Sequence, residues 1–238
     1  MSLDWQAAWQ ALVGHPLFGF ALTLCAYQLS LALYEKTRWV VLQPVLLSII
    51  LVIASLWALG IGFDEYRASS ELLTLLLGPT TVALAVPLYL NLRRIRQLFW
   101  PVLLTLVCGG VAATVFGVGL GWMLGAEEGV LRSMAAKSAT TPIAMLVTEQ
   151  IGGIAALAAV FVMVTGVLGG IFGPELLRLL GVTHPAAVGM ALGINAHAVG
   201  TSRALGEGEE CGAFSALAMS LTGACIALFL PLAAALIS

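Results

Sequence analysis

Residues 150–174 read QIGGIAALAAVFVMVTGVLGGIFGP and contain no Asp, Glu, Lys or Arg. Residues 211–238, at the end of the chain, also lack these charged residues. About 20 consecutive apolar residues are enough for a helix to cross the hydrocarbon core of a bilayer, which is roughly 30 Å thick. Because backbone polar groups cannot remain unpaired in lipid, several such segments in one chain predict a bundle of membrane helices.

The composition of the whole chain supports this prediction. Of its 238 residues, 61% are hydrophobic and 9% are charged, and the mean hydropathy is +1.04. Ordinary globular domains carry about 25% charged residues, so a soluble fold is excluded, and the alternating pattern of a membrane β-barrel is absent. The formal net charge of −2 provides no basic surface for nucleic acid. The sequence therefore predicts an all-α polytopic protein within a lipid bilayer.

The apolar residues fall into runs that are mostly separated by short charged loops. The run after Lys137 and the run after His184 are interrupted by polar residues, glycine or proline. We therefore expect about 7–8 transmembrane or re-entrant helices, some of them discontinuous as in secondary transporters. The runs cover residues 17–33, 41–60, 72–90, 101–124, 139–148, 151–173, 185–200 and 212–237.

Two pairs of segments resemble each other within the chain. PVLLSIIL begins at Pro44 and PVLLTLVC at Pro101, while GPTTVALAVPLY begins at Gly78 and SATTPIAMLVTE at Ser138. Internal duplication is common in secondary transporters, although chance matching in a sequence rich in Leu and Val is the alternative explanation.

The repeat leads to a specific organisation of the chain. We expect a single integral membrane domain over residues 1–238, containing repeat units of about 41–97 and 98–157. If the repeat is real, its two Thr-Thr pairs lie near each other at the centre of the bilayer. Thr80 and Thr81 are then candidate substrate-binding residues together with Thr140 and Thr141.

The segment KSATTPIAML begins at Lys137 and has the features of an anion site. Pro142 favours the first turn of a helix, and Thr140 or Thr141 can cap it. The free N–H groups of such a helix, its hydroxyls and the Lys137 cation would together bind an anion. The alternative is an ordinary helix start at the membrane surface, with Lys137 reaching the lipid headgroups.

Glu149 lies between two apolar segments. An ionisable group at membrane depth usually faces a cavity, so Glu149 is a candidate for carrying a coupled proton. Gly152 and Gly153 follow closely and are typical of a tight turn. Glu149 would then be a solvated acid at the interface.

A second polar cluster lies in LGINAHAVGTSRALGEGEE, residues 192–210. Gly193, His197 and Thr201 have helical i, i+4, i+8 spacing and would share one face if the segment is helical that far. Asn195 and Thr201 offer hydrogen bonds to a substrate, Arg203 adds a cation, and His197 is a candidate for both substrate binding and proton coupling. The alternative is that His197 only packs.

Glycine and proline residues in these segments have two expected roles. Pro142, Gly193 and Gly200 are candidates for breaking helices near the substrate. A second set has GxxxG spacing, which lets membrane helices approach closely. The helix-packing set is Gly117, Gly121, Gly125, Gly166 and Gly170.

No motif for catalysis or metal binding is present. The sequence lacks a Walker motif, a nucleophile elbow and HExxH, so we expect no enzyme, no catalytic residue and no cofactor. The four cysteines show no CxxC spacing, so no metal site is expected. Cys25, Cys108 and Cys225 lie within apolar runs and are expected to act as small buried hydrophobic residues.

Several stretches resemble the LrgB/CidB family of bacterial inner-membrane proteins. They are LLGPTTVALAVPLYLNLRRIRQ from Leu76, KSATTPIAMLVTEQIGG from Lys137, AVGMALGINAHAVGTSRA from Ala187 and GAFSALAMSLTG from Gly212. The family also includes the plastid glycolate/glycerate translocator, whose second half is similar. The family's lysine–threonine–proline segment corresponds to Lys137–Pro142, and its histidine–glycine–threonine segment to His197–Thr201.

The resemblance implies a multi-pass protein of the bacterial inner membrane. It implies a carrier of small monocarboxylates such as pyruvate, glycolate, glycerate or lactate, and a small LrgA/CidA-type membrane protein as partner. We also expect a homo-oligomer. The alternative is a holin- or antiholin-like regulator of murein hydrolase export and autolysis. A pore regulator needs little more than packing faces, whereas a carrier needs a polar site at depth.

Overall fold

The computed structural model describes residues 5–37, 39, 42–83 and 85–237. Within this part of the chain the secondary structure is helical and contains no strand, as the composition predicted. The chain divides into two compact units, Met1–Ala83 and Leu84–Ser238, which are described separately below. The boundary between the two units lies within the predicted repeat unit 41–97, between a helix that ends at Ala83 and a helix that begins at Ala85.

The N-terminal unit contains five helices. Gly60 ends α3 in the left-handed conformation with φ 66°, and α4 then turns away by 118°. The bend packs against α2, where the Gly19 amide donates to the Ser69 hydroxyl at 3.1 Å. The Thr23 and Tyr66 hydroxyls are 2.8 Å apart. The helices are α1 (Trp5–Val13), α2 (Phe18–Thr37), α3 (Pro44–Leu59), α4 (Phe63–Ser69) and α5 (Glu71–Ala83).

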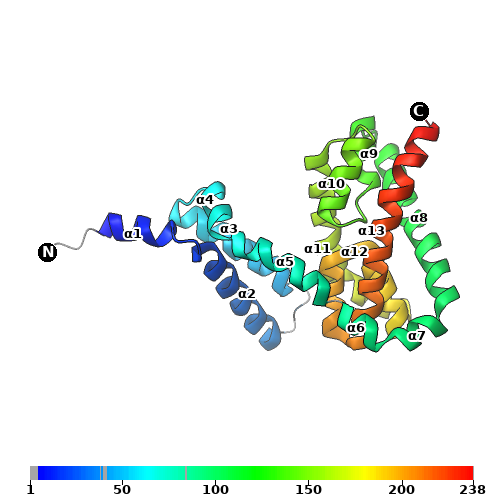
Figure 1. Cartoon of the computed structure of the whole chain (residues 1–238), viewed down its shortest axis with the longest axis horizontal. Coiled ribbons are helices and arrows are strands. Elements are labelled where there is room, and N and C mark those ends of the chain that lie inside the picture. The colour runs from blue at the N-terminus through cyan, green and yellow to red at the C-terminus, as the bar shows by residue number, and fades with distance from the viewer. Residues whose placement is uncertain (1–4, 38, 40–41, 84, 238) are drawn as a thin grey trace. The chain divides into compact units, whose positions relative to one another are not determined.

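The C-terminal unit is built on three long helices, α8, α11 and α13 (Figure 1). All three are long and apolar enough to cross a membrane, and the bent pair α3 and α4 is a fourth candidate span among the described residues. The helices of this unit are α6 (Ala85–Leu90), α7 (Leu92–Gln97), α8 (Phe99–Met123), α9 (Glu128–Ala135), α10 (Thr141–Gln150), α11 (Ala155–Leu179), α12 (Pro185–Glu207) and α13 (Glu209–Ile237).

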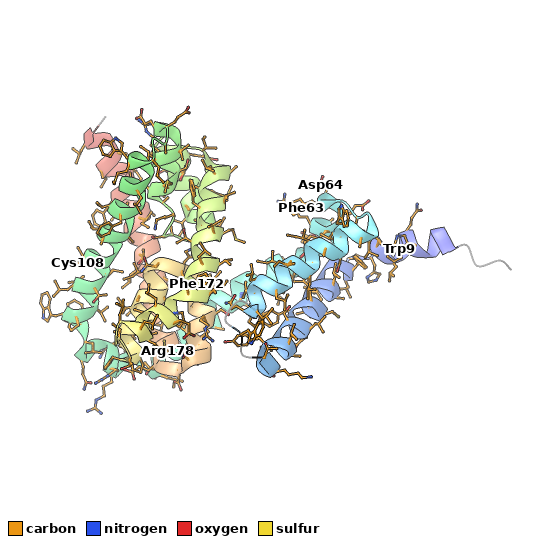
Figure 2. All side chains as sticks on the ribbon, turned by 180° about the vertical axis from the view of Figure 1, so that it is seen from behind. Trp9, Phe63, Asp64, Cys108, Phe172 and Arg178 are labelled. Carbon is orange, nitrogen blue, oxygen red and sulfur yellow. The ribbon has the colours of Figure 1, made fainter. Side chains whose placement is uncertain are left out.

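The outer surface of the long helices is apolar. Side chains project outward along α8, where Cys108 is labelled (Figure 2), and Phe116 and Trp122 are 70% and 71% exposed. Such a surface suits lipid rather than water. Cys108 and Cys25 are exposed on this kind of surface, so the expectation that they are buried is wrong: a small apolar side chain is equally stable against lipid.

Charged side chains gather at the two ends of the C-terminal unit. At one end, Arg178 pairs with Glu207 at 2.9 Å and Arg94 with Glu210 at 3.3 Å. At the other end, Arg132 pairs with Glu128 in the first helix after α8. The apolar parts of α8, α11 and α13 thus lie between two layers of ion pairs, as expected for a membrane protein.

The helices α9 and α10 form a hairpin whose first arm, α9, runs back along α8 and whose second arm, α10, packs against α11 and α13. Gly121 of α8 faces Leu131 and Met134 of α9, and Gly117 faces the side chain of Lys137. The chain then returns, because the Ile154 amide beyond α10 donates to the Ser133 hydroxyl at 2.8 Å. At 8 and 10 residues, each arm is at most about 15 Å long. This is half of a bilayer core.

The helix α12 is also a hairpin, because its backbone reverses at His197. Before His197, Gly189 and Gly193 face the Cys211 and Ser215 carbonyls of α13, so this arm runs parallel to α13. After His197 the order is inverted: Thr201 bonds to Ser215, and the later Leu205 packs on the earlier Gly212. The two arms therefore run in opposite directions, and neither exceeds about 18 Å.

The predicted repeat remains a prediction. Residues 72–90 form two helices, α5 and α6, with residue 84 outside the described part of the chain. Thr80 and Thr81 lie in α5, but their side chains are outside the described residues.

Candidate functional site

The tips of the two hairpins converge beside the middle of α11. Ala136 and Ala139, at the tip between α9 and α10, pack in one cluster with Val162 of α11. The His197 imidazole, at the tip of α12, lies against Gly166 of α11, one turn after Val162, where an added Cβ would be 2.5 Å from the ring Cε1. Lys137 follows Ala136 in the first tip, so both tips meet α11 on neighbouring turns, at Val162 and Gly166. Two polar residues 60 positions apart in the sequence are thus brought together at membrane depth.

Lys137 supplies the cation of this site. Its side chain crosses α8 at Gly117, where an added Cβ would overlap the Lys137 Cε. The residue is half-buried, and no acidic side chain in the described ranges forms an ion pair with it. An unpaired cation in a low-dielectric setting attracts an anion more strongly than the same group does in water.

His197 forms the second tip in an uncommon backbone conformation. Its φ is 37° and its ψ −123°, and within the described part of the chain no other residue except glycine has a positive φ. Such conformations cost about 1–3 kcal/mol and cluster at functional sites. The imidazole is 3% exposed, and its Nε2 has no hydrogen-bond partner among the residues described.

The start of α10 faces the same region with free donors. Thr140 is the N-cap residue, yet its side chain makes no capping hydrogen bond, and Pro142 lies in the first turn. The first amides of the helix are therefore available to a ligand. The nearby Ser138 hydroxyl is buried and without a partner in the part of the chain that is described.

A second helix N-terminus is created by the reversal at His197. The arm of α12 that follows it begins at the tip, so its positive dipole end and the start of α10 both lie at the point of convergence. Two helix N-termini, one lysine and an unpaired imidazole form an environment suited to a small anion.

The predicted face of Gly193, His197 and Thr201 does not exist as a continuous helix face, because the helix reverses at His197. Gly193 and Thr201 nevertheless both contact Ser215 of α13. Gly193 packs against the Ser215 carbonyl, and the Thr201 and Ser215 hydroxyls are hydrogen-bonded at 3.0 Å. Thr201 also contacts Met219. It is positioned to fasten the hairpin to α13. The break lies at His197, while Gly193 and Gly200 are helical residues in close packing.

Two other residues predicted to bind the substrate interact with neighbouring residues of the same helix. Arg203 pairs with Glu207 at 2.8 Å in the ionic layer at the membrane end, so it does not supply the free cation that was expected. Asn195 is exposed, and its side-chain amide donates to the Ala191 carbonyl at 3.0 Å. A role for Arg203 or Asn195 in substrate binding remains a prediction.

Glu149 lies on the surface in the last turn of α10. Gly152 follows with φ 74°, as in the tight turn that was the alternative interpretation. A role for Glu149 in carrying a coupled proton remains a prediction.

The glycines of the helix-packing set have several roles. Gly121 faces α9, and Gly166 faces the His197 ring, where an added Cβ would lie 2.5 Å from Cε1. Gly170 is buried in α11. Gly125 differs from the expectation, because it lies beyond α8 with φ 78° and no atom near its Cβ position. It turns the chain and does not pack helices.

Thr222 was not among the polar residues singled out by its sequence pattern. Its hydroxyl is buried, without a partner in the described ranges, and lines a groove between α8 and α13. A single threonine in the apolar segment 211–238 carries no local signal, so only the fold reveals it.

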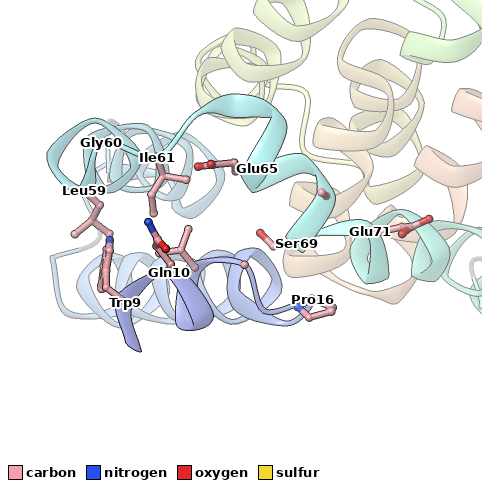
Figure 3. Close-up of a pocket in the computed structure, with 12 residues that line it drawn as sticks. Trp9, Gln10, Pro16, Leu59, Gly60, Ile61, Glu65, Ser69 and Glu71 are labelled. Atoms are coloured by element: carbon pink, nitrogen blue, oxygen red, sulfur yellow. The ribbon is translucent and has the colours of Figure 1, made fainter. Parts of the chain in front are cut away.

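A separate pocket of about 700 Å³ lies in the N-terminal unit. Figure 3 shows Glu65 and Glu71 among its labelled lining residues, together with Trp9 and Ser69. Its charged residues are acidic, so it does not offer the cationic environment found at Lys137.

Comparison with known proteins identifies the family of the chain. The model of the LrgB-like family matches residues 23–236, which includes both hairpins. The chain belongs to the LrgB family. The family membership that the sequence resemblance predicted is therefore confirmed.

Curated LrgB proteins are similar along nearly their whole length. The antiholin-like protein LrgB of Bacillus mycoides (strain KBAB4) is 29% identical over 218 residues, which cover 91% of this chain and 95% of that protein. The antiholin-like proteins LrgB of Bacillus cereus (strain B4264) and Bacillus anthracis (strain CDC 684 / NRRL 3495) are 28% identical over the same shares. These names describe no catalytic activity. No solved structure matches the chain.

Proposed function

We propose that this protein is a secondary carrier for small monocarboxylates such as pyruvate, glycolate, glycerate or lactate. The observation that supports it most is the convergence of two half-membrane hairpins at Lys137 and His197, both without a charged partner among the described residues. Carriers place their substrates near the bilayer centre between discontinuous helices. A pore regulator has no need of such a polar site.

The carboxylate would lie between the two tips. Lys137 would attract it, and the free amides at Thr141 and the Thr140 and Thr141 hydroxyls would donate to its oxygens. The His197 ring would donate to the carboxylate or to the oxygen on the neighbouring carbon. The two hairpins, α9–α10 and α12, enter from opposite ends of the unit. Moving one hairpin at a time would therefore expose the site to one side of the membrane.

His197 would also be the residue through which transport is coupled to protons. His197→Gln keeps a hydrogen-bond donor but cannot titrate. A carrier that needs the proton should still bind substrate in this variant but lose accumulation driven by a pH gradient. Full gradient-driven accumulation in both His197→Gln and His197→Ala would show that the ring only packs.

The proposal includes a cellular setting. We infer a multi-pass protein of the bacterial inner membrane with about 7–8 transmembrane or re-entrant segments, assembled as a homo-oligomer and working with a small LrgA/CidA-type membrane partner. No cofactor takes part in the proposed transport.

The direct test is uptake of labelled pyruvate by proteoliposomes, with and without an imposed pH gradient. Wild-type protein should accumulate pyruvate, and Lys137→Ala should lose uptake by about 100-fold or more, as expected when a buried charge loses its ionic partner. Gly119→Ala is the matched control, because the Cβ position of Gly119 on α8 meets no atom. Equal uptake by wild type and Lys137→Ala would contradict the carrier proposal.

The second candidate function is regulation of autolysis, which the printed name of the relatives favours. The two functions are separable at Lys137. If regulation depends on transport, Lys137→Ala should also lose control of autolysis in cells. If regulation needs only helix packing, the variant should retain it.

A further inference from the structure

The helix α7 carries three arginines that the proposed transport does not use. Its sequence is LRRIRQ, and Figure 1 shows it at the end of the C-terminal unit, where the chain turns into α8. The helix α8, which is long and apolar enough to cross a membrane, begins at Phe99. A short basic helix in this position lies where the hydrocarbon core of the bilayer meets the headgroups.

The two sides of α7 face different surroundings. Ile95 and the following Leu98 pack on the apolar core that α8, α12 and α13 form together. Arg93 and Arg96 are exposed, and their i, i+3 spacing places them on one face of the helix. Because Ile95 and Leu98 fix the inner side of α7, the two guanidinium groups are held on its outer side.

Arg93 and Arg96 also differ from neighbouring arginines in their partners. Arg94, between them in the sequence, pairs with Glu210 of α13 at 3.3 Å. Arg178, at the same end of the unit, pairs with glutamates of α11 and α12. No acidic side chain in the described part of the chain pairs with Arg93 or Arg96. Two adjacent guanidinium groups are thus available to an anion, and their N–H forks match a phosphate.

Aromatic side chains lie directly beyond the arginines. Phe99 and Trp100, in the first turn of α8, are 56% and 68% exposed, and their rings meet edge to face with centroids 5.4 Å apart. Tryptophan is enriched at the headgroup level of membranes, where its ring meets both polar and apolar groups. A phospholipid suits this combination, because its phosphate can meet the arginines while its glycerol esters meet the indole. An acidic protein segment would match the arginines alone.

The opposite end of the unit has the reverse balance of charge. There Glu127 and Glu149 are exposed, and Arg132 is paired with Glu128. Basic residues beside membrane helices mark the cytoplasmic side, and the cytoplasmic leaflet is the one with a negative surface potential. The end that carries α7 is therefore the end expected to meet anionic headgroups.

We propose that the outer face of α7 binds an anionic phospholipid, with Arg93 and Arg96 at its phosphate and Trp100 beside its glycerol. The surface lies outside the two hairpin tips, so the inference does not depend on the proposed transport. A basic residue near an anionic membrane surface strengthens binding about fivefold. Each of the two arginines should therefore have a measurable and separate effect on lipid affinity.

The test is native mass spectrometry of the full-length protein in detergent, titrated with phosphatidylglycerol or with phosphatidylcholine of the same acyl chains. Wild-type protein should bind the first phosphatidylglycerol about 20-fold more tightly than phosphatidylcholine, at about fivefold for each arginine. Arg93→Gln and Arg96→Gln should each lower the affinity for phosphatidylglycerol about fivefold and leave that for phosphatidylcholine unchanged. Equal affinity of the wild type for the two lipids would overturn the proposal.

Arg94→Gln is the matched control for these variants. It makes the same change of charge in the same helix, but it removes an arginine that already pairs with Glu210. Its affinity for phosphatidylglycerol should stay within about twofold of wild type, because its guanidinium faces the unit and not the lipid. A loss as large as that in Arg93→Gln would show that only the total charge matters, which would overturn the assignment of the site.

A competition experiment on the wild type keeps the test decisive if a variant does not fold. Millimolar inorganic phosphate should displace phosphatidylglycerol no more than sodium chloride of equal ionic strength does, because it lacks the glycerol and acyl chains that meet Trp100. Specific displacement by phosphate would assign the arginines to a free anion and overturn the lipid proposal. Neither result bears on the carrier proposal, since no tip residue is changed.

Discussion

The two hairpins of the C-terminal unit occupy equivalent positions but are built differently. In each case a long helix ends and the chain runs back along it: α9 along α8, and α12 along α11. Since α11 begins beside α9, where α8 ends, the two hairpins approach the site from opposite ends. The two tips therefore meet between the two ends of the C-terminal unit.

The hairpins differ in how each tip is formed. The first tip is a five-residue connection, residues 136–140, with a threonine N-cap and a proline. The second is a single residue, His197, held at positive φ. Gly117 leaves space for a flexible lysine, whereas Gly166 leaves space for a rigid ring. The comparison indicates that the first tip can adapt to a ligand while the second is preorganised.

Among variants that compare the two tips, the largest effect is expected at the two glycines that face them, Gly166 and Gly117. In Gly166→Val the new side chain overlaps the His197 ring, which has no room to move. Overpacking of this kind typically costs about 1–3 kcal/mol and shifts the second tip from its place in the proposed site, so pyruvate uptake per folded protein should fall about tenfold or more. Gly117→Val meets the flexible end of Lys137 and should reduce uptake only a few-fold.

Uptake by proteoliposomes, normalised to folded protein, measures both glycine variants. Gly119→Val is the control with free space around it. Equal losses in Gly166→Val and Gly117→Val would mean that the second tip is no more rigid than the first.

A smaller effect should reveal the backbone strain at the second tip. His197→Gly and His197→Ala both remove the ring, but only alanine retains a side chain that disfavours φ 37°. His197→Gly should therefore be more stable than His197→Ala by about 1 kcal/mol. The thermal unfolding midpoint in one detergent should differ by about 2–4 °C. A midpoint that is equal or higher for alanine would show that no strain is stored there.

The smallest effect is expected at Arg203. It pairs with Glu207 outside the tips, so Arg203→Gln should cost about 1–2 kcal/mol of stability and leave uptake within about twofold of wild type. Thermal unfolding at low and high salt together with pyruvate uptake would measure both. A loss of uptake comparable to that of Lys137→Ala would place Arg203 in the site.

The sequence predicted the first tip better than the second. Pro142 and the two threonines before it are local signals of a helix start, and α10 begins at Thr141 in the structure. No local signal indicates that a histidine in AHAVGT takes a conformation suited to glycine. The reversed segment packs on Gly166 and Ser215, which are distant from it in the sequence. Spacing alone therefore predicted one continuous face from Gly193 to Thr201.

The membrane fold itself was largely predictable, because uncharged runs of bilayer length directly reflect the cost of charge in lipid. The roles of individual polar residues were less so. Arg203 and Asn195 have partners on neighbouring turns, while the unpaired hydroxyl of Thr222 depends on the packing of α8 against α13. Sequence identifies polar residues at depth, but only packing determines which of them lack a partner.

The most direct test of the central claim is substrate protection of both tips. Pro142→Cys and Ala198→Cys place one thiol beside each tip in a background lacking the four native cysteines, and Ser220→Cys on the surface of α13 is the control. Pyruvate should slow maleimide labelling of both tip thiols about tenfold, as saturating ligand does at a site it covers, and leave the control unchanged. Protection of only one tip, or of neither, would contradict a carboxylate site shared by the two hairpins.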